Sequence, residues 1–220
     1  MSEDTRLASI APRENLTNAV VMCLPEVLEA PRFLLRCPRV GEGAEVNNAI
    51  RENFEALNRW LPWAREVASV EDTEGFTAQA QEKFQKGEEF VFQIRDKESQ
   101  FLYGYIGLHI NNREVPSFEI GYWSRKEAQG KGYMTEAALF LTAVGFEVLK
   151  ANRMIIRCDA LNDKSHGVIE RCGYLYEGAS RNWFRDNRGE LAMLLTYSLT
   201  PEDYEKLKAE GKFDSFTLPK

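Results

Sequence analysis

The chain has few of the residues that build metal sites, and it has no long apolar run. Its four cysteines form no C-x-x-C pair and it has only two histidines, so the ligand spacing of a structural zinc site is missing. The longest apolar stretch, residues 19–24, is too short for a signal core or a membrane span. We therefore expect a cytoplasmic protein with reduced cysteines, no metal and no membrane partner.

An excess of positive charge is also missing. The 28 lysines and arginines are outnumbered by 34 aspartates and glutamates, which gives a formal net charge of −6. Nonspecific nucleic-acid binding needs a basic face that displaces counterions, so we expect no nucleic-acid partner. Apolar residues make up 44% of the 220 positions, which is enough for a globular core.

Several motifs of phosphate and acyl chemistry are absent as well. No segment matches the nucleotide P-loop G-x-x-x-x-G-K-[ST] or the nucleophile elbow G-x-S-x-G. A G-x-G turn at Gly130 and Gly132 has Thr135 where the dinucleotide fingerprint requires a third glycine. P-loop nucleotide hydrolysis, dinucleotide binding and serine hydrolysis are therefore not indicated.

The chain does contain a glycine turn between a strand pattern and a helix pattern. Residues 118–123 are strand-like, and residues 137–148 carry apolar side chains at helical spacing. A helix N-terminus after such a turn presents unpaired N–H groups and a favourable dipole to an anion. Because Lys131 adds a positive charge, segment 129–134 predicts a phosphate site; a turn that only connects two elements is the alternative.

Three segments carry a family resemblance. Residues 129–134 are close to a Gln/Arg-x-x-Gly-x-Gly/Ala loop, with Met134 in place of the last small residue. Residues 162–174 follow N-x-x-S-x-x-V-x-x-R-x-G-Y and lead into Glu177-Gly178, and residues 60–63 read Trp-Leu-Pro-Trp. Together they resemble the GNAT acetyltransferase superfamily, and within it the RimJ/RimL-type branch that acetylates protein N-termini.

The resemblance implies a single α/β (α+β) domain with a mixed, mostly antiparallel sheet of about seven strands, splayed central strands and about four flanking helices. It divides the chain into an N-terminal arm (1–31), the GNAT domain (32–199) and a C-terminal helix and tail (200–220). The residue patterns themselves predict strands at 33–37, 89–95, 101–110, 117–123, 153–159, 174–183 and 191–199, and helices at 43–57, 69–86, 132–149, 163–172 and from 200 onward.

The resemblance also implies acetyl-CoA as acyl donor, with its pantetheine arm between strands 117–123 and 153–159. The expected cofactor-binding residues are Tyr122, Trp123, Ser124, Gln129, Gly130, Lys131, Gly132, Tyr133, Met134, Thr135 and Asn162. Backbone groups near residues 122–124 would polarise the thioester carbonyl, a contribution of about 3 kcal/mol for an oxyanion donor of this kind.

Two residues are candidates for proton transfer. Glu119 begins the strand beside the expected cofactor groove and is the candidate base, although a solvated carboxylate at a strand end is nearly as good an interpretation. Ser165, by resemblance, would donate a proton to the leaving thiolate, unless it and Asn162 serve only to start a helix. His166 is interpreted as a surface histidine because neighbours on a helix point apart.

The acceptor is the least determined part of the prediction. Trp60 and Trp63 flank Pro62 and are expected at the acceptor groove, with a packing role for one of them as the alternative. We expect transfer of an acetyl group to a primary amine, in the first place a protein N-terminal α-amine. A small amine (antibiotic, polyamine or amino acid) and a non-catalytic CoA-binding module remain open, as does a homodimer.

Overall fold

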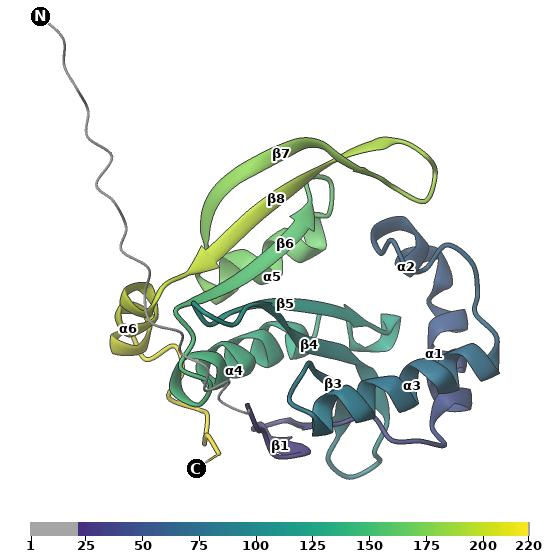
Figure 1. Cartoon of the computed structure of the whole chain (residues 1–220), viewed down its shortest axis with the longest axis horizontal. Helices are drawn as coiled ribbons and strands as arrows, with labels where there is room; N and C mark the ends of the chain where they lie inside the picture. Colours follow the sequence, from purple (N-terminus) through teal and green to yellow (C-terminus); the bar gives the residue numbers. More distant parts are fainter. Residues whose placement is uncertain (1–21, 220) are drawn as a thin grey trace, which may run out of the picture.

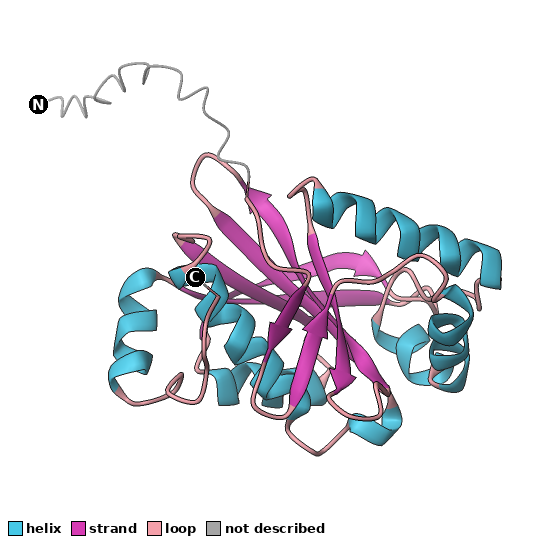
Figure 2. Cartoon of the chain, turned by 90° about the horizontal axis from the view of Figure 1, so that it is seen from below, coloured by secondary structure: helices cyan, strands magenta, loops and turns pink. Residues whose placement is uncertain are grey.

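The computed structural model describes residues 22–219, which form one eight-stranded sheet with helices on both sides (Figures 1 and 2). The strands are β1 (Val27–Glu29), β2 (Phe33–Arg36), β3 (Phe90–Asp96), β4 (Leu102–Asn112), β5 (Ser117–Ser124), β6 (Arg153–Asp159), β7 (Leu175–Arg185) and β8 (Leu191–Leu199). The helices are α1 (Gly43–Glu52), α2 (Phe54–Trp60), α3 (Val70–Gln85), α4 (Tyr133–Glu147), α5 (Asp163–Cys172) and α6 (Pro201–Ala209), with a short 3₁₀ turn η1 (Lys126–Ala128).

The order of the strands is β1-β2-β3-β4-β5-β6-β8-β7, and every neighbouring pair is antiparallel except β5 with β6. The predicted fold class is therefore confirmed, with eight strands instead of about seven and six α-helices instead of about four. None of the helices in the described part of the chain is long and apolar enough to cross a membrane.

The centre of the sheet is splayed, as predicted. β5 and β6 pair only at Ser117↔Arg153, Phe118↔Met154 and Glu119↔Ile155. Beyond these pairs the two strands separate, and α2 lies opposite the opening (Figure 1). Backbone groups of β5 after Glu119 and of β6 after Ile155 thus lack each other as partners, which leaves them available to an extended ligand.

Two predicted boundaries need correction. Residues 27–29 were expected in an irregular arm, but they form edge strand β1, because Leu28 is only 3% exposed and anchors this short segment on the core. The expected helix at 43–57 is interrupted at Asn53, whose Nδ2 donates to the Ala49 carbonyl at 2.8 Å. The rest of the expected arm, residues 1–21, lies outside the described residues.

The interruption at Asn53 has a consequence for the glycine turn. The Oδ1 atom of this buried residue accepts a hydrogen bond from the backbone N–H of Lys126 at 2.7 Å. Asn53 therefore fixes η1, the turn that directly precedes residues 129–132, to the helical layer formed by α1 and α2.

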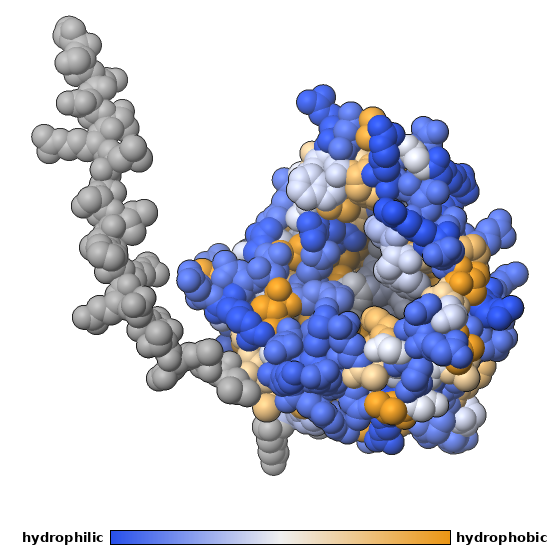
Figure 3. Space-filling view, turned by 45° about the vertical axis from the view of Figure 1, so that its right-hand side comes forward, coloured by the Kyte–Doolittle hydropathy of each residue, from blue (hydrophilic) through white to orange (hydrophobic). Residues whose placement is uncertain are grey.

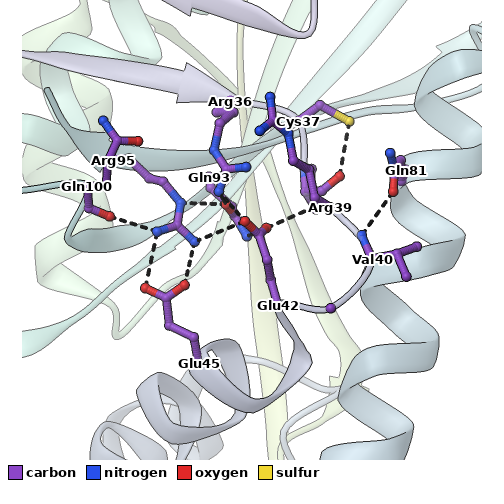
Figure 4. Close-up of polar contacts among 12 residues, drawn as sticks. Arg36, Cys37, Arg39, Val40, Glu42, Glu45, Gln81, Gln93, Arg95 and Gln100 are labelled. Carbon is purple, nitrogen blue, oxygen red and sulfur yellow. Dashed lines mark hydrogen bonds and ion pairs between the residues drawn. The ribbon is translucent and has the colours of Figure 1, made fainter.

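A buried polar cluster joins that helical layer to the sheet (Figure 4). Arg36, Gln93 and Arg95 are its buried members, Glu42 is half-buried, and the exposed Glu45 accepts from the Arg95 guanidinium at 2.7 Å. Gln93 donates to the Tyr105 hydroxyl at 2.9 Å, and the Tyr105 ring stacks on Trp123 with centroids 5.3 Å apart. The cluster thus supports the strand residue that precedes Ser124 at the open end of β5.

Candidate active site

The glycine turn adopts the conformation that its sequence requires. Gly130 has φ +72° and Gly132 has φ +81°, a left-handed region that other residues enter at a cost. Gly132 is the N-cap of α4, and its carbonyl accepts the first helical bond from Glu136 at 3.0 Å. The first-turn amides of α4 have no acceptor within the helix, so the turn retains the donor character predicted for it.

A cavity of about 1030 Å³ extends from the open end of β5 over this turn to α5. Figure 3 shows the face of the molecule that is hollowed beside the helical layer. Of the expected cofactor-binding residues, those that line the cavity are Tyr122, Trp123, Ser124, Gln129, Gly130, Lys131, Gly132, Met134, Thr135 and Asn162. Trp60 and Ser165 line it as well.

The side chain of Tyr133 points elsewhere. Its ring stacks on Tyr103 with centroids 4.4 Å apart and packs edge-on against Phe33, while the Arg32 guanidinium covers it at 4.6 Å. The first residue of a helix that packs on a sheet turns its side chain toward the strands, so only the backbone of Tyr133 is left to face an anion. The prediction that Tyr133 belongs to the cofactor site therefore rests on its backbone N–H.

Gln129 connects the two sides of the cavity, and Asn162 begins the helix on one of them. The Gln129 Oε1 accepts a hydrogen bond from Lys164 Nζ at 2.8 Å, which connects the glycine turn to α5. Asn162 caps α5, because its Oδ1 accepts from the Ser165 N–H at 3.2 Å. Asn162 therefore caps the helix, as the alternative interpretation had it, and also lines the cavity.

Ser165, in the first turn of α5, is bonded to a residue of β5. It is 8% exposed, and its Oγ lies 2.7 Å from the Tyr122 hydroxyl. Burial raises the pKa of Tyr122, so the phenol stays protonated at neutral pH and can donate a hydrogen bond to Ser165. Burial also raises the pKa of the neighbouring Cys158 thiol to about 11, which leaves that thiol a poor nucleophile.

A second cavity of about 350 Å³ lies on the other side of Ser165. It shares Trp60, Leu61, Tyr122, Asn162 and Ser165 with the first cavity. Its remaining lining residues are Pro62, Glu119, Ile120, Gly121, Arg157, Cys158, Asp159, Trp183, Phe184 and Leu194. The hydroxyls of Tyr122 and Ser165 therefore lie where the two cavities meet.

Glu119 lines this second cavity in an ion pair. The Arg157 guanidinium of β6 donates to the Glu119 carboxylate through Nε at 3.0 Å and also through Nη2. Both bonds go to the same carboxylate oxygen, Oε2, which leaves Oε1 to contact an amine or a water. Asp159 provides a second carboxylate in the same cavity, a residue that no sequence motif indicated.

The β7–β8 hairpin closes the second cavity from above. At its tip, the Asn187 amide donates to the carbonyls of Asn58 at 2.7 Å and of Leu61 at 3.0 Å. Asp186 stabilises the turn through the N–H groups of Arg188 and Glu190, both at 2.9 Å, and does not enter the cavity. The turn lies between the two strands predicted at 174–183 and 191–199, but no sequence pattern indicated the contact made by Asn187.

The two tryptophans separate in the structure. Trp60 ends α2 and lines both cavities, whereas Trp63 is 54% exposed and lines neither. His166, interpreted as a surface residue, is half-buried, and its Nδ1 lies 3.2 Å from the Tyr197 hydroxyl. The sequence also gave no role to Arg171, which lines the larger cavity at its far end.

A splayed parallel strand pair, a glycine turn at a helix start and two cavities that meet at a hydroxyl pair define an acyl-CoA-dependent transferase. Comparison with known proteins agrees: the model of the acetyltransferase (GNAT) domain matches residues 32–175. The chain therefore belongs to the GNAT acetyltransferase family and is an acetyl-CoA-dependent N-acetyltransferase, closest in type to the RimJ/RimL group.

Similar proteins lie in the same group. The chain is 34% identical over 161 residues to the "Putative ribosomal N-acetyltransferase YdaF" of Bacillus subtilis (strain 168), covering 71% of this chain and 84% of that protein. It is 31% identical to the ribosomal-protein-serine acetyltransferase of Escherichia coli (strain K12) over 59% of this chain and 71% of that protein. The structure of RimL in complex with coenzyme A has the same fold, with TM-score 0.74, 21% identity and coverage of 80% and 98%.

Proposed function

We propose that the chain acetylates the N-terminal α-amine of a protein, with a ribosomal protein as the leading candidate. The observation that carries this proposal is the second cavity, which is lined by two carboxylates and four aromatic side chains and lies on the far side of Ser165 from the glycine turn. A cationic or weakly basic amine suits the carboxylates, and an extended peptide end suits the aromatic walls. The names of two relatives point to the same class of acceptor, and a ribosomal acceptor would place the reaction in the cytosol, as the sequence predicts.

The proposed reaction is direct transfer in a ternary complex. The diphosphate of acetyl-CoA is held at residues 129–132, and backbone groups of residues 122–124 polarise the thioester carbonyl. The neutral amine attacks the carbonyl carbon, the C–S bond breaks, and the thiolate takes a proton from the Ser165 hydroxyl, which Tyr122 resupplies. The attacking nitrogen loses its extra proton to Glu119 or Asp159, directly or through water, and solvent water returns a proton to Tyr122 and removes the one on the carboxylate.

The α-amine fits this machinery better than a lysine side chain does. An α-amine has a pKa of about 8, whereas a lysine amine lies at about 10.4, so far less of the lysine is neutral at pH 7. Because Arg157 occupies one oxygen of Glu119, an acceptor amine that is already partly neutral makes the smaller demand on the site.

Thiol release from acetyl-CoA tests the proposal with two matched peptides. One carries a free N-terminus and the other the same sequence with a blocked N-terminus and one lysine, and small amines form a third panel. We expect release with the free N-terminus and one added acetyl group on its first residue by mass spectrometry. Release with the small amines alone would replace the proposed acceptor, and coenzyme binding without any release would favour a binding module.

A further inference from the structure

A histidine lies beside the candidate base, on the neighbouring strand. His109 of β4 and Glu119 of β5 are register partners, so their side chains project from the same face of the sheet with Cβ atoms about 4.5–5.5 Å apart. Glu119 lines the second cavity on this face, and His109 lies just outside that cavity. The His109 side chain is 46% exposed, so its ring reaches solvent on its outer side.

Two glycines leave room for the His109 ring. Gly107 and Gly121 are also register partners, and the ring extends over this pair. A Cβ at Gly121 would lie 3.0 Å from His109 Nε2, and a Cβ at Gly107 would lie 3.4 Å from the same atom. Because Gly121 follows Glu119 on the same face and lines the second cavity, Nε2 lies at the edge of that cavity.

The other ring nitrogen of His109 is held by a carboxylate. Nδ1 lies 2.6 Å from Glu89 Oε1, and Lys83 Nζ donates to Glu89 Oε2 at 3.3 Å. The hydrogen bond from His109 lowers the pKa of Glu89 against the opposing effect of burial, so Glu89 is ionised at neutral pH. An ionised carboxylate only accepts, so the neutral imidazole carries its proton on Nδ1 and keeps a lone pair on Nε2. Within residues 22–219, Nε2 has no hydrogen-bond partner.

A base at Glu119 needs an exit for its proton while the acceptor is bound. Arg157 from β6 occupies Oε2 of Glu119, whose side chain is 23% exposed, and an acceptor in the second cavity would cover the cavity side of the carboxylate. The direction that stays open is toward β4 and His109. The charged groups around the imidazole are Glu119, Glu89 and, behind Glu89, Lys83 from α3, so a positive charge on the ring is offset by a carboxylate on each side.

We propose that His109, positioned by Glu89, receives at Nε2 the proton that Glu119 removes from the acceptor amine and releases it to solvent. One water between Glu119 Oε1 and Nε2 carries the transfer. The protonated carboxyl group donates to this water, the water donates to Nε2, and Glu119 is again a carboxylate beside an imidazolium. A solvent water then takes the proton from Nε2 and restores the neutral ring. The proposal rests on the proposed function, because it requires Glu119 as the base and an amine in the second cavity.

Steady-state thiol release in dilute buffer tests the relay, with whichever amine the unmodified protein acetylates. We expect His109→Gln to lower kcat about ten-fold, less than a directly acting base contributes, and to leave the acceptor KM and the Kd of acetyl-CoA unchanged. Added imidazole should restore most of this rate, because a small buffer can take the proton from Glu119, and should restore none in Glu119→Gln. Glu89→Gln should give a smaller decrease. Glu82→Gln is the matched control, because that carboxylate is exposed on α3 and pairs with Lys86.

Nitrogen NMR of the unmodified protein gives a second, independent measurement. The chain has only two histidines, so comparison with His109→Gln assigns their ring signals. We expect the neutral ring of His109 to be protonated at Nδ1.

Three results would overturn the relay and leave the proposed function intact. The first is an unchanged kcat in His109→Gln. The second is a decrease that imidazole does not restore, or one that comes with a raised acceptor KM, because either would assign a packing role to the ring. The third is a neutral imidazole protonated at Nε2, which could not accept the proton. Absence of thiol release by the unmodified protein with every amine would instead overturn the proposed function, and the relay with it.

Discussion

Loss of the Ser165 hydroxyl should slow acetyl transfer without weakening acetyl-CoA binding. Ser165→Ala keeps the backbone N–H that donates to Asn162 Oδ1 at 3.2 Å, so the start of α5 is retained. What disappears is the Oγ that lies 2.7 Å from the Tyr122 hydroxyl. The substitution therefore removes the proposed proton donor and little else from the cavity.

The size of the effect follows from the leaving group. Positioned proton transfer contributes about 10² to 10⁴ in rate, and a thiol of pKa about 8.5 leaves with less assistance than an alkoxide would need. We therefore expect the lower end, a decrease of about 100-fold in kcat, which corresponds to about 2.7 kcal/mol at 1.36 kcal/mol for each factor of ten. Tyr122→Phe should give a similar decrease.

A double-mutant cycle shows whether the two hydroxyls act in series. If Tyr122 resupplies Ser165, the double variant should be little slower than either single variant, since both changes break one path. Thr142 and Tyr174 provide a matched control, because their buried hydroxyls lie 2.8 Å apart and line neither cavity. Tyr174→Phe should lower stability, by about 1 kcal/mol, and leave kcat unchanged.

Stopped-flow or steady-state thiol release gives kcat, and calorimetry gives the Kd of acetyl-CoA. The reasoning would be refuted if Ser165→Ala weakened acetyl-CoA binding and turned over the bound complex at the original rate. It would also be refuted if the effects of the two single variants simply multiplied, because independent contributions exclude a shared path.

Three further predictions concern the turn, the hairpin and the buried cluster. Gly132→Ala places a residue with a Cβ at φ +81°, which should lower stability by about 1–2 kcal/mol and weaken acetyl-CoA binding in calorimetry. Gly189→Ala, at φ +85° in the hairpin, is the control: it should lower stability by a similar amount and leave acetyl-CoA binding unchanged. Asn187→Ala releases the hairpin tip and should raise the KM of the acceptor but not the Kd of acetyl-CoA; a change confined to the coenzyme would contradict it. The net pKa of Glu42 is lowered. Burial alone would raise this pKa, but the hydrogen bonds from the Arg36 guanidinium and the Arg39 backbone N–H have the larger combined effect. This contribution is therefore present above the unfolded value of 4.5 and lost as pH falls through the lower folded value, so Glu42→Gln should destabilise by roughly 3 kcal/mol at pH 7 and by less at pH 3 in urea unfolding. Glu82→Gln, which breaks an exposed pair with Lys86, is the control and should leave the unfolding midpoint nearly unchanged at both pH values.

The parts of the site that could be predicted are those with a local cause. A turn of this kind before a helix needs residues with a left-handed backbone conformation at fixed positions, and Gly130 and Gly132 occupy those positions. Asn162 caps α5, as expected of Asn at a helix start. The order of strands and helices followed from apolar periodicity, which is also a local property.

The missed parts depend on contacts between distant segments. Asn53 binds Lys126 across 73 positions and Asn187 binds Asn58 across 129 positions, and neither asparagine belongs to a recognisable pattern. Asp159 and Arg171 face cavities only because β6 diverges from β5 and α5 packs beside α4. For Tyr133 the motif concerns only the backbone, and the rotation of α4 on the sheet decides the direction of the ring.

The divergence of β5 from β6 also separates two routes to the reaction centre. Tyr122, Asn162 and Ser165 line both cavities and form the wall between them. In the proposed reaction, the coenzyme and the acceptor would therefore enter from opposite sides, and either product could dissociate without displacing the other.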